Sequence, residues 1–249
     1  MPDPGATLML PRPSTGRVFT AGRRVRLGDV DPAGRCRLDA VARYLQDVAL
    51  DDSADAGLDK AMGWVVRRTM IDVHHAAGFE EWLELATWCS GHGGRWAERR
   101  TEIRGDRGAS VDTVTLWVHV DPSTGRPLRL FEQFFHIWGE STGGRKVSAR
   151  TSLDSDPGDA PGEPWLVRAT DLDLAGHVNN AAHWAPVEQV LSSAGVPDRF
   201  RAELEHGTGV TPGQPAMLHV DRTGAEVRTW LLVGGVAAGV ARVAPLGSG

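Results

Sequence analysis

The stretch VRLGDVDPAG, residues 25–34, returns at residues 167–176 as VRATDLDLAG, 142 residues further along the chain. Both copies fit the pattern V-R-x-x-D-x-D-x-A-G, which two unrelated decapeptides would rarely share. Such a repeat decides the fold before any single motif does, because it implies that one structural unit occurs twice. The sequence therefore predicts a chain built by duplication and fusion.

A helix is expected after the first copy. Leu38, Val41, Leu45 and Val48 recur at the spacing of one helical face, with polar residues between them. Gly57 follows this pattern and is a typical residue just past a helix end. We therefore predict a buried-side helix over residues 38 to about 57.

The second copy is also followed by a helix-like segment. Asn179 or Asn180 can cap it, and it runs to Ala194 before the stop signals of Gly195 and a nearby proline. Pro186 lies inside this segment and is expected to kink the helix, because proline removes one backbone hydrogen bond.

Strand-like segments follow each helix in comparable order, so each half reads as a strand, a helix and then several strands. The segments are residues 64–75, 81–91, 95–105 and 109–121 in the first half, and 201–209, 215–221, 226–235 and 235–245 in the second. The fold class is α+β, with one long helix on an antiparallel sheet in each half. The predicted boundaries are a loose N-terminal arm (1–16), a first repeat (17–151), a linker (152–164) and a second repeat (165–249).

Composition restricts the classes of function. The net charge of −5 and the pI near 6.0 give no basic excess for nucleic-acid binding. Cys36 and Cys89, the only two cysteines, fit a reducing compartment, and no segment has the length and apolarity of a membrane span. We expect a cytoplasmic protein that uses no metal and no cofactor and has a small-molecule substrate.

The second copy carries the most specific motif. DLDLAGHVNNAAHWAPVE, residues 171–188, resembles the D-x-D-x-x-x-H-V-N-N signature of the acyl-acyl-carrier-protein (acyl-ACP) thioesterases, within the hotdog thioesterases. TWCSGHGGRWAERRTEI (87–103) is similar to a first-half strand pair of these enzymes, and DPAG (31–34) resembles the turn of hydroxybenzoyl-CoA-type hotdogs. The resemblance spans about residues 17 to 245. It implies a tandem (double) hotdog with the acyl chain in a tunnel, which hydrolyses fatty-acyl thioesters of acyl-carrier protein or coenzyme A.

The resemblance also implies where the site lies. Asp173 and His177 match catalytic positions of the family, and Asn179 and Asn180 match its paired asparagines. Plant members have an Asn two residues after the Asp, where this chain has Ala175. Their later catalytic Glu falls on a glycine near residue 209. The full plant active site is therefore not reproduced.

The chemistry of thioester hydrolysis assigns roles to these residues. Asp173 could deprotonate water or attack directly, and His177 could protonate the departing thiolate, because its ordinary pKa of about 6.5 lies near neutrality. Gly176 would let the substrate carbonyl approach backbone N–H groups at the helix N-terminus. Glu188 follows His177 by eleven residues, about three helical turns, and is expected to share its face.

The first copy lacks these partners. Arg35 stands where the second copy has His177, and Gln46 aligns with Glu188, while Asp31 is retained. We interpret the first copy as a degenerate site that shapes the acyl tunnel, with Asp31 as a substrate contact. The two cysteines are expected to pack in the core.

Two other functions fit the sequence. One is a hotdog hydratase or dehydratase acting on acyl thioesters, and the other is a non-catalytic module that binds them. Coenzyme A and an acidic carrier protein both remain possible carriers, and a cluster of arginines is a candidate docking surface. The cluster consists of Arg23, Arg24, Arg26, Arg35 and Arg37. The fused repeats predict a monomer or a further homodimer, with no nucleic-acid or membrane partner.

Overall fold

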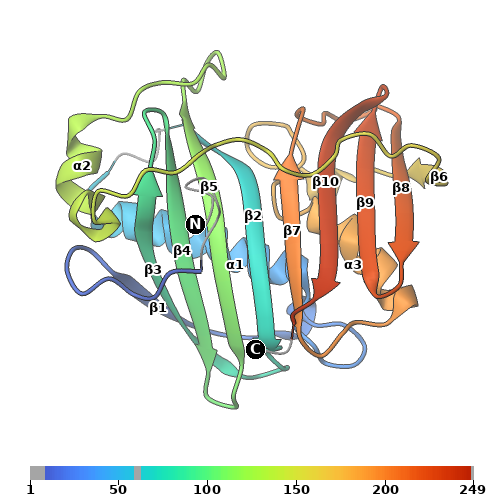
Figure 1. Ribbon diagram of the computed structural model, residues 1–249, viewed down its shortest axis with the longest axis horizontal. Helices are drawn as coiled ribbons and strands as arrows, with labels where there is room; N and C mark the ends of the chain where they lie inside the picture. The colour runs from blue at the N-terminus through green and yellow to red at the C-terminus, as the bar shows by residue number, and fades with distance from the viewer. Residues whose placement is uncertain (1–8, 59–62, 248–249) are drawn as a thin grey trace.

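A computed structural model describes residues 9–58 and 63–247 (Figure 1). The first half contains β1 (Phe19–Arg24), α1 (Leu38–Asp55), β2 (Gly63–His75), β3 (Trp82–His92), β4 (Trp96–Gly105) and β5 (Ser110–Val120). The second contains β6 (Gly162–Trp165), α3 (Trp184–Ala194), β7 (Phe200–His206), β8 (Ala216–Thr223), β9 (Glu226–Val233) and β10 (Val236–Pro245). A short helix, α2 (Glu132–Trp138), lies between the halves in sequence.

The strands form one antiparallel ten-stranded sheet in the order β1-β3-β4-β5-β2-β7-β10-β9-β8-β6. This order is symmetric about the β2–β7 pair, so each half contributes five strands arranged in the same way. At that junction Asp72 faces Arg201, and their side chains form an ion pair at 2.6 Å. The β2–β7 pairing therefore joins the two repeats into a continuous sheet.

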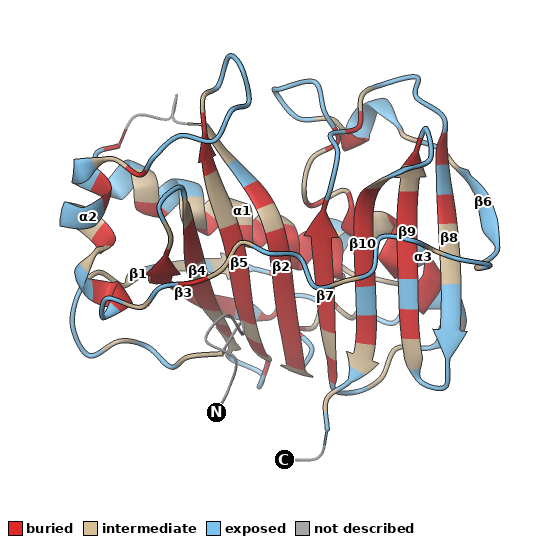
Figure 2. Ribbon diagram, turned by 45° about the horizontal axis from the view of Figure 1, so that its top comes forward, coloured by how far each residue is buried: buried red, intermediate tan, exposed pale blue. Residues whose placement is uncertain are grey.

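Both long helices lie behind the sheet in the view of Figure 1 and pack against each other. One cluster of buried apolar side chains runs through both halves, including Leu38 and Leu45 of α1 with Trp184 and Leu191 of α3. Burial is concentrated on the central strands and falls off toward β8 and β6 (Figure 2). The long helix of each repeat therefore packs against the other repeat in a core that both share.

No helix within residues 9–58 and 63–247 has the length and apolarity needed to cross a membrane.

The eight predicted strands are confirmed, and so is the first helix, which ends at Asp55 just before Gly57 at φ +72°. Helix α3 differs from the prediction because its regular part begins at Trp184 rather than beside Asn179. Pro186 therefore falls in the first turn, where its missing N–H has no partner to lose. The predicted kink is wrong for that reason.

The N-terminal arm is more ordered than predicted where it is described. Arg100, a buried side chain of β4, donates from Nε to the carbonyl of Leu10 at 3.0 Å. Arg12 forms an ion pair with Glu102 at 2.8 Å. The expectation of a loose arm is therefore wrong for residues 9–16, because these contacts bind it to the sheet; residues 1–8 lie outside the described residues.

The segment between the repeats crosses the face of the sheet opposite the long helices (Figure 1). The buried carboxylate of Glu205 on β7 accepts hydrogen bonds from the backbone of Ser152 at 2.7 Å and of Leu153 at 3.1 Å. Trp230 of β9 donates to the Asp154 carbonyl at 2.8 Å. The predicted linker is therefore bonded to the second half, and its last residues already belong to β6.

Candidate active site

The two copies of the repeated motif fold into the same turn. Gly34 and Gly176 have φ of +83° and +73°, a left-handed conformation that glycine adopts without strain. Each donates its N–H to the carbonyl three residues earlier, at 2.9 Å to Asp31 and at 3.0 Å to Asp173. In both copies Oδ1 of this Asp accepts the N–H of the second residue after it, at 2.9 Å. The sequence repeat is thus a repeat of hydrogen bonds.

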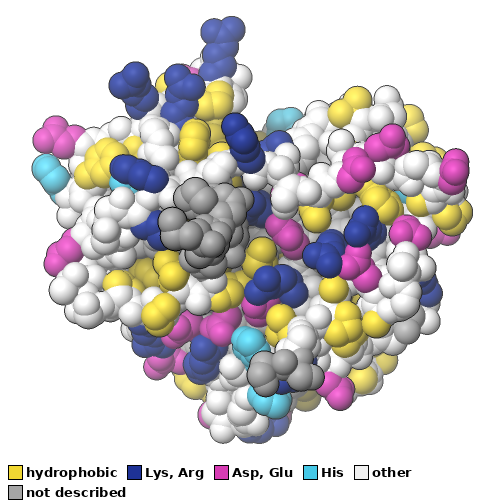
Figure 3. Space-filling view, in the orientation of Figure 1, with side chains coloured by type: hydrophobic (Ala, Val, Ile, Leu, Met, Phe, Trp, Pro, Cys, Tyr) yellow, Lys and Arg dark blue, Asp and Glu magenta, His cyan; other side chains and the backbone are white. Residues whose placement is uncertain are grey.

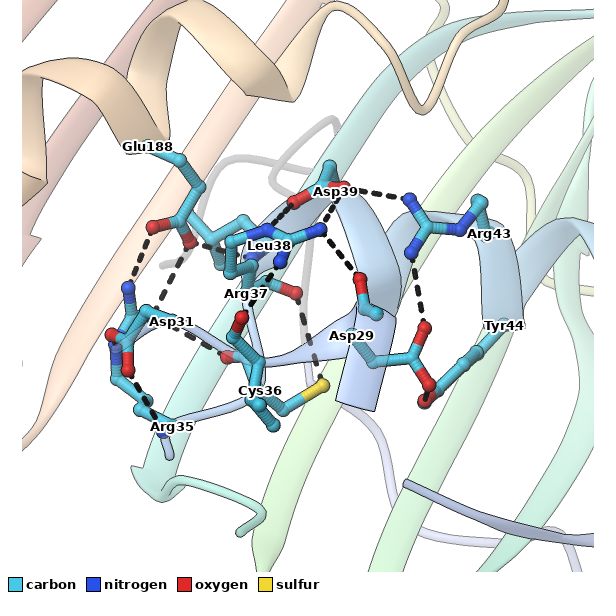
Figure 4. Close-up of polar contacts among 12 residues, drawn as sticks. Asp29, Asp31, Arg35, Cys36, Arg37, Leu38, Asp39, Arg43, Tyr44 and Glu188 are labelled. Carbon is cyan, nitrogen blue, oxygen red and sulfur yellow. Dashed lines mark hydrogen bonds and ion pairs between the residues drawn. The ribbon is translucent and has the colours of Figure 1, made fainter. Parts of the chain in front are cut away.

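The first copy is closed by an ion-pair network (Figure 4). Arg35 donates from Nε to Asp31 Oδ2 at 3.0 Å and from Nη2 to Glu188 Oε2 at 2.6 Å. Glu188 Oε1 also accepts the N–H of Leu38, the first residue of α1, at 2.6 Å. Burial acts to lower the pKa of Arg35, but hydrogen bonds and charge from Glu188 and then Asp31 raise it. Arg35 therefore stays charged and holds both carboxylates.

These contacts correct two predictions. Glu188 does not face His177, because His177 precedes the regular helix and the eleven-residue spacing is not helical throughout. Its carboxylate caps α1 of the other repeat instead. Asp31 is less free for a substrate than predicted, because Arg35 binds its Oδ2 and two backbone N–H groups bind its Oδ1.

A second group of charges extends the closed network along α1. Asp39 accepts hydrogen bonds from Arg37 at 2.8 Å and from Arg43 at 2.6 Å, and Tyr44 donates to Asp29 at 2.6 Å (Figure 4). Burial acts to raise the pKa of Asp39, but the hydrogen bonds from Arg37 and Arg43 bring it below its usual value. The N-terminal turns of α1 are therefore fixed by ionised side chains.

The second copy opens onto a cavity of about 400 Å³. The turn and the residues after it contribute Asp173, Asn179 and Asn180, while α1 contributes the face bearing Gln46, Ala49, Leu50 and Ser53. These α1 positions are spaced three and four residues apart and lie on one side of the helix. The remaining lining residues are Asp47, Trp64, Cys89, Ala97, Glu98, Arg99, Trp117, Phe134 and Trp138. The cavity therefore lies between the turn of the second repeat and the helix of the first.

The charged groups deep in this cavity are paired. Arg99 donates to the buried carboxylate of Asp52 at 2.7 Å, and Trp138 Nε1 donates to the same oxygen at 2.9 Å. Glu98 pairs with Arg145. Paired charges leave the aromatic and aliphatic surfaces to contact an apolar ligand. Burial raises the pKa of the Cys89 thiol to about 11, which supports its predicted role in packing.

Asp173 differs from its twin by having a free oxygen. Its Oδ1 is held by a backbone N–H, as in the first copy, but no group in the described part of the chain donates to Oδ2. Its side chain is exposed at the cavity. The same turn thus presents one carboxylate locked by Arg35 and one carboxylate ready to accept a proton.

The other predicted residues of the second copy lie as follows. Asn179 Oδ1 accepts the N–H of Ala181 at 2.8 Å, so it caps the first turn after the motif, and Asn180 lines the cavity. His177 is exposed and is not among the residues that line the cavity; its ring lies against Gly209, where a Cβ would lie 3.3 Å from the imidazole Cδ2. Gly176 is not available to a substrate carbonyl, because its N–H is bonded to Asp173.

The contribution of α1 to this site was not predicted from the sequence. Gln46 and Ser53 line the cavity, yet they belong to the repeat that lacks the signature motif. The signal was present, because Gln46 aligns with Glu188 at the repeat offset. Only the packing of α1 against α3 shows that each helix contributes a side chain near the turn of the other repeat.

Two buried histidines predict that the stability of the folded protein decreases at acid pH. The rings of His183 and His206 are 5.0 Å apart, and burial lowers the pKa of His183 to about 4. The unfolded chain, with a His pKa of about 6.5, binds more protons below that pH, so stability falls as the pH drops from about 6.5 toward 4. For His183 alone we expect a loss of about 2 kcal/mol at pH 5.

Urea unfolding at pH 7.5 and pH 5 measures this effect. His183→Leu should remove about 2 kcal/mol of the pH dependence, whereas His136→Leu, at a histidine whose side chain is 73% exposed, should leave it unchanged. An equal pH dependence in wild type and His183→Leu would contradict the assignment.

Comparison with known proteins agrees with this geometry. Residues 16–138 match the acyl-ACP thioesterase N-terminal domain family. An uncharacterized protein of Mycobacterium tuberculosis is 31% identical over 230 residues, which are 91% of each chain. A proposed oleoyl thioesterase from Lactobacillus plantarum has a TM-score of 0.78 at 18% identity, over 94% of this chain and 99% of that one. The 12:0-ACP thioesterase from Umbellularia californica has a TM-score of 0.73 at 20% identity, over 91% and 96%.

The two structural likenesses establish the shared fold, and the family match confirms the resemblance drawn from the motif. The chain belongs to the acyl-ACP thioesterase family, whose members are thioester hydrolases.

Proposed function

We propose that this chain hydrolyses an acyl thioester in the cavity between its second-repeat turn and α1, with Asp173 as the general base. The observation that carries the proposal is the free Oδ2 of Asp173 at a cavity with aromatic and aliphatic walls, in contrast to the twin turn, where Arg35 binds Asp31 Oδ2. A carboxylate with one oxygen anchored and one free is held in place and can still accept a proton.

The residues support a balanced reaction. Asp173 Oδ2 takes one proton from a water molecule, whose oxygen attacks the thioester carbonyl carbon. The carbon–sulfur bond breaks, and the thiolate leaves with a proton from the exposed His177, which then regains a proton from solvent. Asp173 then returns its proton to solvent. The products are a free acid and a thiol.

The sheet supports a tandem hotdog, because each repeat contributes one long helix and five strands in the same order. We place the repeats at residues 17–151 and 165–249, with the bonded linker between them. The β2–β7 pairing provides within one chain the contact between repeats, so we expect a monomer to be active.

The cavity also indicates the length of the acyl chain. Gln46 and Ser53 are seven residues apart on α1, which is about 10 Å of helix. An extended chain advances about 1.2 Å per bond, since three backbone bonds span 3.3–3.6 Å. The walls of Phe134 and Trp138 end the cavity on the α2 side. A medium-length acyl chain of about eight carbons therefore fits.

An acidic carrier protein fits the surface. Of the arginines suggested by the sequence, Arg23, Arg35 and Arg37 are in ion pairs with Asp47, Glu188 and Asp39. A different set lies on adjacent loops, is exposed, and has no carboxylate partner among residues 9–58 and 63–247. This set is Arg95, Arg126, Arg129 and Lys146. Cations gather over these loops at the upper left of Figure 3. Such a patch attracts an acidic protein.

A hydrolysis panel tests the proposal. Purified chain is assayed for thiol release from carrier-protein and coenzyme A thioesters of four to sixteen carbons, for which we expect a maximum near eight carbons and a preference for the carrier protein. Arg126→Glu/Arg129→Glu should raise KM for the carrier-protein substrate about tenfold at low salt and leave coenzyme A thioesters unchanged. Absence of thiol release across the panel would refute the proposed function.

A further inference from the structure

The twin turns differ at two aligned positions, one directly after the glycine of the turn and one on the helix of the other repeat. In the first copy these are Arg35 and, from α3, Glu188, which bind each other at 2.6 Å. In the second copy the aligned residues are His177 and, from α1, Gln46. The hydrogen bonds from the glycine and alanine N–H groups are the same in the two turns, while Asp31 Oδ1 also accepts the backbone N–H of Arg35. The closed site therefore carries an ion pair at two positions where the open site carries a histidine and a glutamine.

The packing of the two long helices places Gln46 at the open cavity. Because α1 and α3 pack against each other, each reaches the turn of the other repeat. Glu188 does so at the closed site, and Gln46 lines the open cavity together with Asp173, Asn179 and Asn180. The first copy thus shows which side chain the second copy brings to its Asp.

A carboxamide suits this place better than a carboxylate. The charged groups lining the cavity are Asp47, Asp173, Glu98 and Arg99. Asp47, Glu98 and Arg99 are already in ion pairs. A glutamate at position 46 would face Asp173 without an arginine to neutralise it, and the repulsion would favour protonation of Asp173. Glutamine supplies a hydrogen-bond acceptor without that charge.

We propose that Gln46 is the third group of the active site and positions the attacking water. Its Oε1 accepts one proton of the water in a hydrogen bond while Asp173 removes the other, so the water oxygen is aimed at the thioester carbonyl. Gln46 itself exchanges no proton. This inference rests on the proposed hydrolysis and replaces Glu188, which the sequence suggested, as the third group.

Substitution at Gln46 tests this role. Gln46→Ala should lower kcat about 100-fold with KM changed less than threefold, because a misplaced nucleophile costs on that order. Gln46→Glu should shift the acid limb of the kcat–pH profile upward by about one unit, since a second carboxylate raises the pKa of Asp173. The matched control is Gln189→Ala, an exposed glutamine of α3 at the closed site, with wild-type kinetics expected.

The outcomes separate this inference from the proposed function. Absence of hydrolysis by wild type, or full activity of Asp173→Asn, would refute the function itself. If those two behave as proposed while Gln46→Ala keeps wild-type kcat, or Gln46→Glu leaves the acid limb in place, only the role of Gln46 is refuted. Urea unfolding of each variant ensures that a loss of kcat reflects folded protein.

Discussion

Asp173→Asn is expected to lower kcat/KM for acyl thioester hydrolysis about 10³-fold, within the range for removal of a general base. Asparagine keeps the Oδ1 that accepts the backbone N–H of Ala175, so the turn should fold as before. It removes the proton acceptor at Oδ2, which faces the cavity. Steady-state thiol release across pH 5–9 measures the loss.

Asp31→Asn is the matched control, because Asp31 occupies the same turn and its Oδ1 accepts the corresponding N–H, that of Ala33. Its carboxylate faces Arg35 rather than the cavity, so kcat/KM should stay within about threefold of wild type. A large loss of activity in Asp31→Asn with a small one in Asp173→Asn would place the chemistry in the first repeat and contradict the assignment.

Glu188→Ala is expected to lower the free energy of unfolding by about 3–5 kcal/mol, the range for breaking a buried ion pair. The carboxylate side chain is 8% exposed, and its loss leaves Arg35 without its partner at 2.6 Å. It also removes the hydrogen-bond acceptor of the Leu38 N–H at the start of α1. Urea unfolding at pH 7.5 measures the change.

Glu226→Ala is the control for this prediction. Glu226 also pairs with arginines, but Arg228 and Arg242 are 47% and 44% exposed, so the loss should be at most about 1 kcal/mol. The folded fraction of Glu188→Ala should keep kcat within a few-fold of wild type, because Glu188 belongs to the closed site. Equal stability losses in the two variants, or a kcat loss as large as that of Asp173→Asn, would contradict this account.

The sequence predicted the elements well because their signals are local and occur twice. Leu38, Val41, Leu45 and Val48 mark one helical face without any knowledge of the fold, and the helix is present over Leu38–Asp55. Because the sequence repeats, the order of strands expected in one half also predicted the order in the other half. The short helix α2 has no counterpart in the second repeat and was not predicted.

The site was predicted only in part because its partners come from different repeats. Asp173, Asn179 and Asn180 lie near one another in sequence and were identified together. Glu188 was assigned by counting helical turns from His177, but the helix begins later and α3 carries it to the first-repeat turn. Gln46 lies at the cavity because α1 likewise packs toward the turn of the other repeat. The spacing of residues in the sequence cannot show this contact between repeats.

The central claim is that one of two structurally equivalent turns is open to substrate. Titration calorimetry with a non-hydrolysable eight-carbon acyl thioether of carrier protein tests it most directly. We expect one equivalent per chain, no binding to Ala49→Trp, in which the cavity is filled, and unchanged binding to Ala185→Trp, in which the groove beside Asp31 is filled. Two equivalents per chain, or binding that Ala185→Trp abolishes and Ala49→Trp retains, would contradict the claim.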